Sequence, residues 1–109
     1  RSLREAVGGC LRKHGVRTAL VYGSAARGEE GPASDLDLLV AFDEGRSLLD
    51  LAGLQLDLQD RLDRRVDLVT AGGVGKGLAR NILSEGILLL GDTTWPELLR
   101  SRLSGGDVP

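Results

Sequence analysis

The chain has 109 residues, of which 41% are hydrophobic, and its formal net charge is −2. This length predicts one domain, and no apolar run approaches the ~20 residues that a membrane-spanning helix needs. The acidic pI of about 5.3 disfavours duplex nucleic acid as a partner, because binders of nucleic acid usually present a basic face. A single cysteine, Cys10, can form no internal disulfide, which favours the cytoplasm.

Helices are predicted where apolar residues recur every three or four positions, and strands where short β-branched and aliphatic runs lie between turn signals. In chain order these are a helix over 3–14, a strand over 17–22, a short helix over 24–28, a loop over 29–34, a strand over 35–42, a helix over 47–64, a strand over 66–70, a helix over 76–85, a strand over 87–90 and a helix over 94–103. We therefore predict an α/β (α+β) fold with a small mixed sheet of about four strands packed against helices. Residues 1–103 are expected to form a single domain, and 104–109 a flexible C-terminal tail.

The helix over 47–64 is rich in leucine. Its core face is predicted from the residues that share one side at helical spacing, namely Leu48, Leu51, Ala52, Leu58 and Leu62. Leu49 and Leu56 lie beside this stripe. Ordinary core packing is the favoured interpretation for these two leucines, and a surface for a partner protein is the alternative.

Two carboxylates open the strand over 35–42. Asp35 and Asp37 are two positions apart, so they project to the same face of the strand and repel each other unless a cation lies between them. Asp67, on the next strand, is flanked by apolar residues and could complete a set of three oxygen ligands. Such a set favours Mg²⁺ and predicts a two-metal site. The alternatives are a solvated strand end for the pair, and an ion pair with Arg64 or Arg65 for Asp67.

A glycine–serine turn precedes the acids. Gly23 lets the backbone approach an anion closely, and the Ser24 hydroxyl and the Arg27 guanidinium could both donate hydrogen bonds to phosphate. This turn is predicted to hold a triphosphate. Two structural alternatives remain open: Ser24 could serve only as a helix cap, and Arg27 could pair only with Glu29 or Glu30.

Three further features are interpreted as structural. The glycine-rich run over 72–77 lacks the spacing of a phosphate-binding loop and is predicted to be a connector, although Lys76 could lie near the nucleotide. His14 and Cys10 lie on the apolar stripe of the first helix and are expected to pack there. The sequence begins with Arg1 rather than Met, which is compatible with an upstream segment.

The motifs resemble a known family. Gly23-Ser24, ten residues and then Asp35-Leu36-Asp37 match the GS-x10-D-x-D signature of nucleotidyltransferases related to DNA polymerase β. The short chain resembles the minimal nucleotidyltransferases (MNT). The match extends over residues ~17–90. It includes the Gly-Ser-x-Ala-Arg-Gly turn and the stretches Ser34-Asp35-Leu36-Asp37-Leu38, Val66-Asp67-Leu68-Val69 and Ile82-Leu83-Ser84-Glu85-Gly86.

The resemblance implies a nucleotidyltransferase fold, two Mg²⁺ ions and ATP as substrate. It also implies an antitoxin that transfers AMP to a hydroxyl, as on tyrosine, of a HEPN-type toxin. Asp35 and Asp37 would bind both metals, and Asp67 would complete one metal shell and help to draw the proton from the attacking hydroxyl. Gly23, Ser24 and Arg27 would hold the β- and γ-phosphates.

Two other functions remain as alternatives. A non-catalytic binding module could neutralise its partner by covering it, and a transferase could act on a small molecule, such as an aminoglycoside, or on RNA 3′ ends. The chain has little beyond a catalytic core, so the acceptor surface is expected to come from a partner protein or a second copy in a hetero- or homo-oligomer. This shortage of sequence, with the acidic pI, disfavours small-molecule and RNA acceptors.

Overall fold

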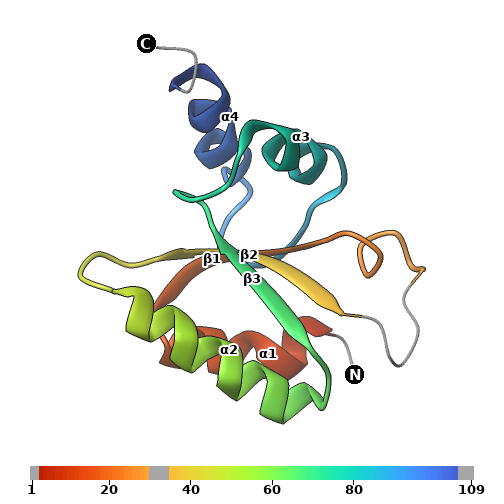
Figure 1. The fold of residues 1–109 in the computed structure, drawn as a ribbon, viewed down its shortest axis with the longest axis vertical. Helices are drawn as coiled ribbons and strands as arrows, with labels where there is room; N and C mark the ends of the chain where they lie inside the picture. Colours follow the sequence, from red (N-terminus) through yellow and green to blue (C-terminus); the bar gives the residue numbers. More distant parts are fainter. Residues whose placement is uncertain (1–2, 30–34, 106–109) are drawn as a thin grey trace.

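A four-stranded mixed sheet with helices on both faces forms the domain, as the computed structural model shows (Figure 1). The structure describes residues 3–29 and 35–105, and side chains up to residue 100. Its elements are α1 (Leu3–Lys13), β1 (Val16–Tyr22), β2 (Leu36–Phe42), α2 (Leu48–Leu62), β3 (Val66–Thr70), α3 (Lys76–Glu85), β4 (Ile87–Leu90) and α4 (Pro96–Gly105). The predicted α/β (α+β) class and its four strands are confirmed.

The strand order is β3-β2-β1-β4. Strand β1 is antiparallel to both β2 and β4, whereas β2 and β3 are parallel. A parallel pair cannot be joined by a tight turn, so α2 carries the chain back across one face of the sheet between these strands. The register places Asp37 beside Tyr22 of β1 on one side and beside Asp67 of β3 on the other.

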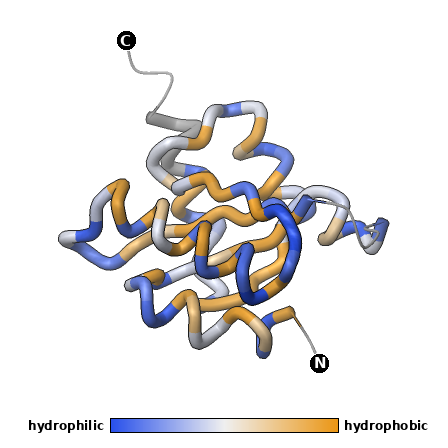
Figure 2. The backbone as a smooth tube through the Cα atoms, turned by 60° about the horizontal axis from the view of Figure 1, so that its bottom comes forward, coloured by the Kyte–Doolittle hydropathy of each residue, from blue (hydrophilic) through white to orange (hydrophobic). Residues whose placement is uncertain are grey.

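Alternate residues of the central strands enter two separate cores. One core lies between the sheet and the pair α1 and α2, and it includes Leu38 and Leu58. The other lies between the sheet and the pair α3 and α4, and it includes Leu20, Leu39 and Ile82. Since both faces are covered, the central strands are almost uniformly apolar, and the tube through the middle of Figure 2 is mostly hydrophobic.

Helix α2 begins at a reciprocal cap, in which the Ser47 hydroxyl accepts from the Leu49 N–H and the Asp50 carboxylate accepts from the Ser47 N–H. Its buried residues are Leu54 and Leu58. The predicted core face is therefore wrong at its first turns, where Leu48 and Ala52 are exposed.

The two leucines beside the predicted stripe do not pack in the core. Leu49 is 84% exposed and Leu56 is 67% exposed, which makes core packing the wrong interpretation for both. Helix α2 packs on the sheet through the face that carries Leu54 and Leu58. Leucines also occur on a second face of the helix, and this face stays exposed. The result is an apolar stripe on the outer surface of α2.

Most predicted boundaries agree with the structure to within two residues. Helix α4 continues to Gly105, two residues beyond the predicted helix end at 103, and residues 106–109 lie outside the described part of the chain. Most of the predicted 29–34 loop, residues 30–34, also lies outside it. None of the helices in the described ranges combines the length and apolar character that a bilayer-spanning helix requires.

Candidate active site

The acids singled out in the sequence meet at one end of the sheet. Asp37 on β2 and Asp67 on β3 are direct neighbours in register, and both share the sheet face that carries α3 and α4. Asp35 immediately precedes β2 and is exposed, whereas Asp37 and Asp67 are half-buried. The strand pairing therefore assembles two carboxylates from distant parts of the chain and adds a third at the rim.

The electrostatics of this group are unfavourable without a cation. Burial, followed by the charges of Asp67 and Asp35, raises the pKa of the Asp37 carboxyl above its usual value, and Arg27 opposes this only in part. Burial, followed by the charges of Asp37 and Asp67, raises the pKa of the Tyr22 phenol to about 12. The end of the sheet thus concentrates negative charge in a partly desolvated place.

Oxygen ligands of this kind fit Mg²⁺. The three carboxylates do not all approach one another within 4.8 Å; among the described residues only Cys10, His14 and Asp57 form a group that close. A divalent cation would offset the burial and the repulsion that together raise the pKa of Asp37. Asp35, Asp37 and Asp67 are therefore the residues that would hold metal here.

The unfavourable electrostatic environment of Asp37 predicts that removing its charge will stabilise the metal-free protein. Because the folded state raises the pKa of Asp37, ionisation costs stability, and the cost grows as the pH rises from about 3.9, the unfolded value, through the folded value. We expect Asp37→Asn to increase the free energy of unfolding of the metal-free protein by about 1 kcal/mol at pH 7.

Urea unfolding in EDTA at several pH values measures this effect. The difference between the variant and the wild type should shrink toward pH 3, where Asp37 is neutral in both states. Asp60→Asn, on the exposed side of α2, serves as the control. A variant that unfolds at lower urea than the wild type at pH 7 would contradict the assignment of strain to Asp37.

The glycine–serine turn lies directly against the acids. Gly23 has a φ of 74°, and a β-carbon placed on it would lie 2.7 Å from Oδ2 of Asp37. The following residues form hydrogen-bonded turns, with the Arg27 N–H donating to the Gly23 carbonyl at 3.2 Å and the Glu29 N–H to the Ser24 carbonyl at 2.9 Å. The predicted short helix over 24–28 is therefore wrong, and Ser24 is not a helix cap.

Arg27 forms an ion pair with Glu85, for which the sequence motifs predict no role. Its Nη1 donates to both carboxylate oxygens of Glu85, at 3.1 and 2.9 Å, and its Nε donates to Glu29 at 3.0 Å. The Gly23 N–H also donates to Glu85, at 3.2 Å. The pairing of Arg27 with Glu29 was anticipated, and Glu30 lies outside the described residues. The signal that could have found Glu85 is an acid in the last turn of a helix, where the dipole disfavours it.

The close group on the other face is an ion-pair network. Asp57 accepts a hydrogen bond from His14 at 2.9 Å and forms ion pairs with Arg61 at 3.0 Å and Lys13 at 3.7 Å. Hydrogen bonds from His14, Cys10 and Arg61 hold the pKa of the Asp57 carboxyl well below its usual range. Burial, followed by Asp57, raises the pKa of the Cys10 thiol to about 11. These contacts agree with the structural interpretation of Cys10 and His14.

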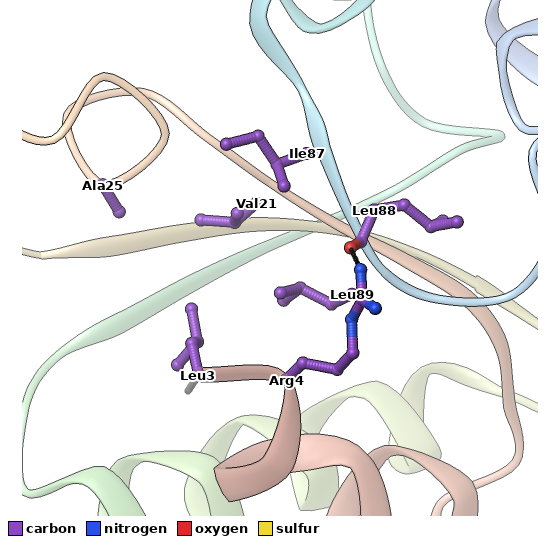
Figure 3. A pocket seen from close by; sticks show the side chains of 7 residues that line it. All are labelled: Leu3, Arg4, Val21, Ala25, Ile87, Leu88 and Leu89. Atoms are coloured by element: carbon purple, nitrogen blue, oxygen red, sulfur yellow. Dashed lines mark hydrogen bonds between the residues drawn. The ribbon is translucent and has the colours of Figure 1, made fainter. Parts of the chain in front are cut away.

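A cavity of about 360 Å³ lies between the start of α1 and the edge strand β4. Figure 3 shows its apolar lining and the hydrogen bond of 2.9 Å from Arg4 to the Leu88 carbonyl. Val21 and Leu89 of the lining belong to the core beneath α1 and α2, on the opposite face of the sheet from Asp37. None of the acids lines the cavity, which touches the candidate active site only at Ala25 of the glycine–serine turn.

Comparisons with known proteins agree with this geometry. Residues 6–94 match the family model described as Polymerase beta, Nucleotidyltransferase. A protein of Methanocaldococcus jannaschii with a provisional protein adenylyltransferase name is 44% identical over 80 residues, which are 73% of this chain and 86% of that protein. The protein adenylyltransferase MntA of Thermococcus cleftensis is 42% identical over 73 residues, which are 67% of this chain and 74% of that protein.

Solved structures share the fold. A toxin–antitoxin crystal structure with AMP-PNP gives a TM-score of 0.81 at 22% identity, over 96% of this chain and 87% of that one. A complex of MNT antitoxin with tri-AMPylated HEPN toxin from Shewanella oneidensis gives 0.71 at 20% identity, over 94% of this chain and 82% of that one. At these identities the likeness establishes the fold.

Proposed function

Because the chain belongs to the polymerase β nucleotidyltransferase family, we propose that it transfers AMP from ATP to a hydroxyl, as on tyrosine, of a HEPN-type toxin and so acts as its antitoxin. The observation that carries this proposal is the register of Asp37 with Asp67 directly beside the glycine–serine turn. That placement supports the proposal because carboxylates suited to Mg²⁺ lie next to a turn suited to phosphate.

Each residue then has a role that its position supports. Asp35 and Asp37 would hold two Mg²⁺ ions, which when bound stabilise charge on the α-phosphate and the leaving diphosphate. Asp67 would complete one metal shell and help to draw the proton from the attacking hydroxyl. Gly23, Ser24 and Arg27 would hold the β- and γ-phosphates. The hydroxyl of the acceptor would then attack the α-phosphate in line with the leaving diphosphate.

The names of the relatives support the reaction. One relative at 42% identity is named a protein adenylyltransferase, and the chain covers 74% of its length. Structures with the same fold contain AMP-PNP in one case and an AMPylated HEPN toxin in another, which supports ATP as the donor and a protein as the acceptor. The buried free thiol of Cys10 supports a reducing compartment such as the cytoplasm.

The experiment is direct. The protein is incubated with the product of a neighbouring HEPN-type gene, ATP and Mg²⁺, and the intact mass of that product is measured. We expect a gain of one or more AMP units that requires Mg²⁺ and is absent in EDTA. Tight binding with unchanged mass would instead establish a non-catalytic module. Parallel reactions with GTP, CTP and UTP test the preference for adenine.

A further inference from the structure

We propose that Glu85 is a positioning residue that fixes the phosphate-binding turn and its arginine in the orientation that nucleotide binding requires. The inference rests on the proposed function, because it assigns Glu85 a role only through a nucleotide held by that turn. One carboxylate accepts hydrogen bonds from the Gly23 backbone and from the Arg27 guanidinium. It therefore ties the first residue of the turn to the arginine that follows one turn later.

The position of Glu85 on its helix is costly without such a role. It is the last residue of α3, and the carbonyl end of a helix disfavours a negative charge by a few tenths of a kcal/mol or more. Within α3 no basic residue occupies the last turn to offset this cost. The hydrogen bonds from Arg27, with a smaller contribution from the Gly23 N–H, instead lower the pKa of Glu85 and keep it ionised.

The helix provides a rigid base for this contact. Ala79 and Ile82 of α3 are fully buried in the core beneath α4. Gly86 follows at once, and its N–H donates to the Ile82 carbonyl at 2.7 Å, which closes the end of the helix. The helix that carries Glu85 is thus held by the core, whereas the glycine–serine turn is half-buried over residues 23–26 and exposed from Arg27 to Glu29.

The consequence for binding is entropic. An exposed arginine loses considerable side-chain freedom when it grips a phosphate, and a partner that already holds the guanidinium removes part of that loss. Glu85 also holds Gly23 at a position where even a β-carbon would lie 2.7 Å from Oδ2 of Asp37, so the same carboxylate links the proposed phosphate-binding turn to the proposed metal-binding acids. We expect this contribution to affect the binding of ATP more than the chemical step.

The test is Glu85→Gln, which keeps the length of the side chain and an oxygen for the Gly23 N–H but removes the charge that holds Arg27. AMP transfer to the partner toxin should show a KM for ATP raised about tenfold with kcat changed by less than about twofold. Glu97→Gln is the matched control, since Glu97 forms a comparable exposed pair with Arg100 on α4, at 2.8 Å. It should leave both constants unchanged.

A double-mutant cycle separates positioning from a general structural effect. Adding Glu85→Gln to Arg27→Ala should change the KM for ATP little further if Glu85 acts through Arg27. Equal losses in both backgrounds, or a wild-type KM in the single variant, would overturn the inference. Wild-type protein that neither binds ATP nor modifies its partner would overturn the proposed function itself, which distinguishes the two failures.

Discussion

Replacing Asp35 and Asp37 together by asparagine is expected to reduce AMP transfer at least about a thousandfold, because metal stabilisation of the transition state contributes several kcal/mol. Asparagine keeps the size of each side chain but removes two of the three charges that would hold Mg²⁺. The readout is the intact mass of the partner toxin after incubation with ATP. Persistent transfer by this double variant would refute the metal assignment.

The matched control removes two aspartates elsewhere. Asp60→Asn with Asp63→Asn alters α2 and its left-handed end, where Asp63 has a φ of 50° that asparagine adopts readily. Helix α2 packs on the face of the sheet opposite the acids, so the control should retain transfer. The active-site double variant should also unfold cooperatively, and at no lower urea concentration than the wild type in EDTA, since it loses the repulsion around Asp37.

Gly23→Ala is the second substitution with a large expected effect. A φ of 74° costs an alanine roughly 1–2 kcal/mol, and its methyl group would in addition lie 2.7 Å from Oδ2 of Asp37. The carboxylate must move or the turn must shift, so the acids proposed to bind metal and the turn proposed to hold phosphate both lose their geometry. We expect transfer to fall by about a hundredfold, the scale that a misplacement of about 1 Å can produce.

Gly28→Ala isolates the contact from the backbone strain. Gly28 has a nearly identical φ of 72°, but no atom lies within 4 Å of a β-carbon placed there. The two variants should therefore lose similar stability in urea unfolding, whereas only Gly23→Ala should lose most of its AMP transfer. Equal transfer by the two variants would show that the close approach of the added methyl group to Asp37 does not matter.

The order of helices and strands could be predicted well from the amino-acid sequence, because apolar runs and turn residues are local signals. Each strand is a short aliphatic run, and turn residues such as Gly15 and Gly86 punctuate the helices. The placement of Asp37 beside Asp67 also followed, once the two strands were taken as neighbours. The roles of these acids in catalysis remain predictions until the substitutions above are made.

Other features depended on packing that spacing does not reveal. Leucines occur on several sides of α2, so its periodicity allowed two core faces, and contact with the sheet buries Leu54 rather than Leu48. The turn after Gly23 lacks the regular hydrogen bonds of the predicted short helix. Glu85 lies far from Arg27 in sequence, and only the tertiary fold brings them together.

The crossover between the two parallel strands has a consequence for protein synthesis. Asp37 and Asp67 are separated by the whole of α2 and its flanking loops, and Glu85 follows later still. A chain synthesised only as far as β2 therefore carries Asp35 and Asp37 without Asp67 or Glu85, and non-local pairing of this kind forms slowly. Under the proposed function, an incomplete translation product would be inert toward ATP, and protection against the toxin would begin only with a finished chain.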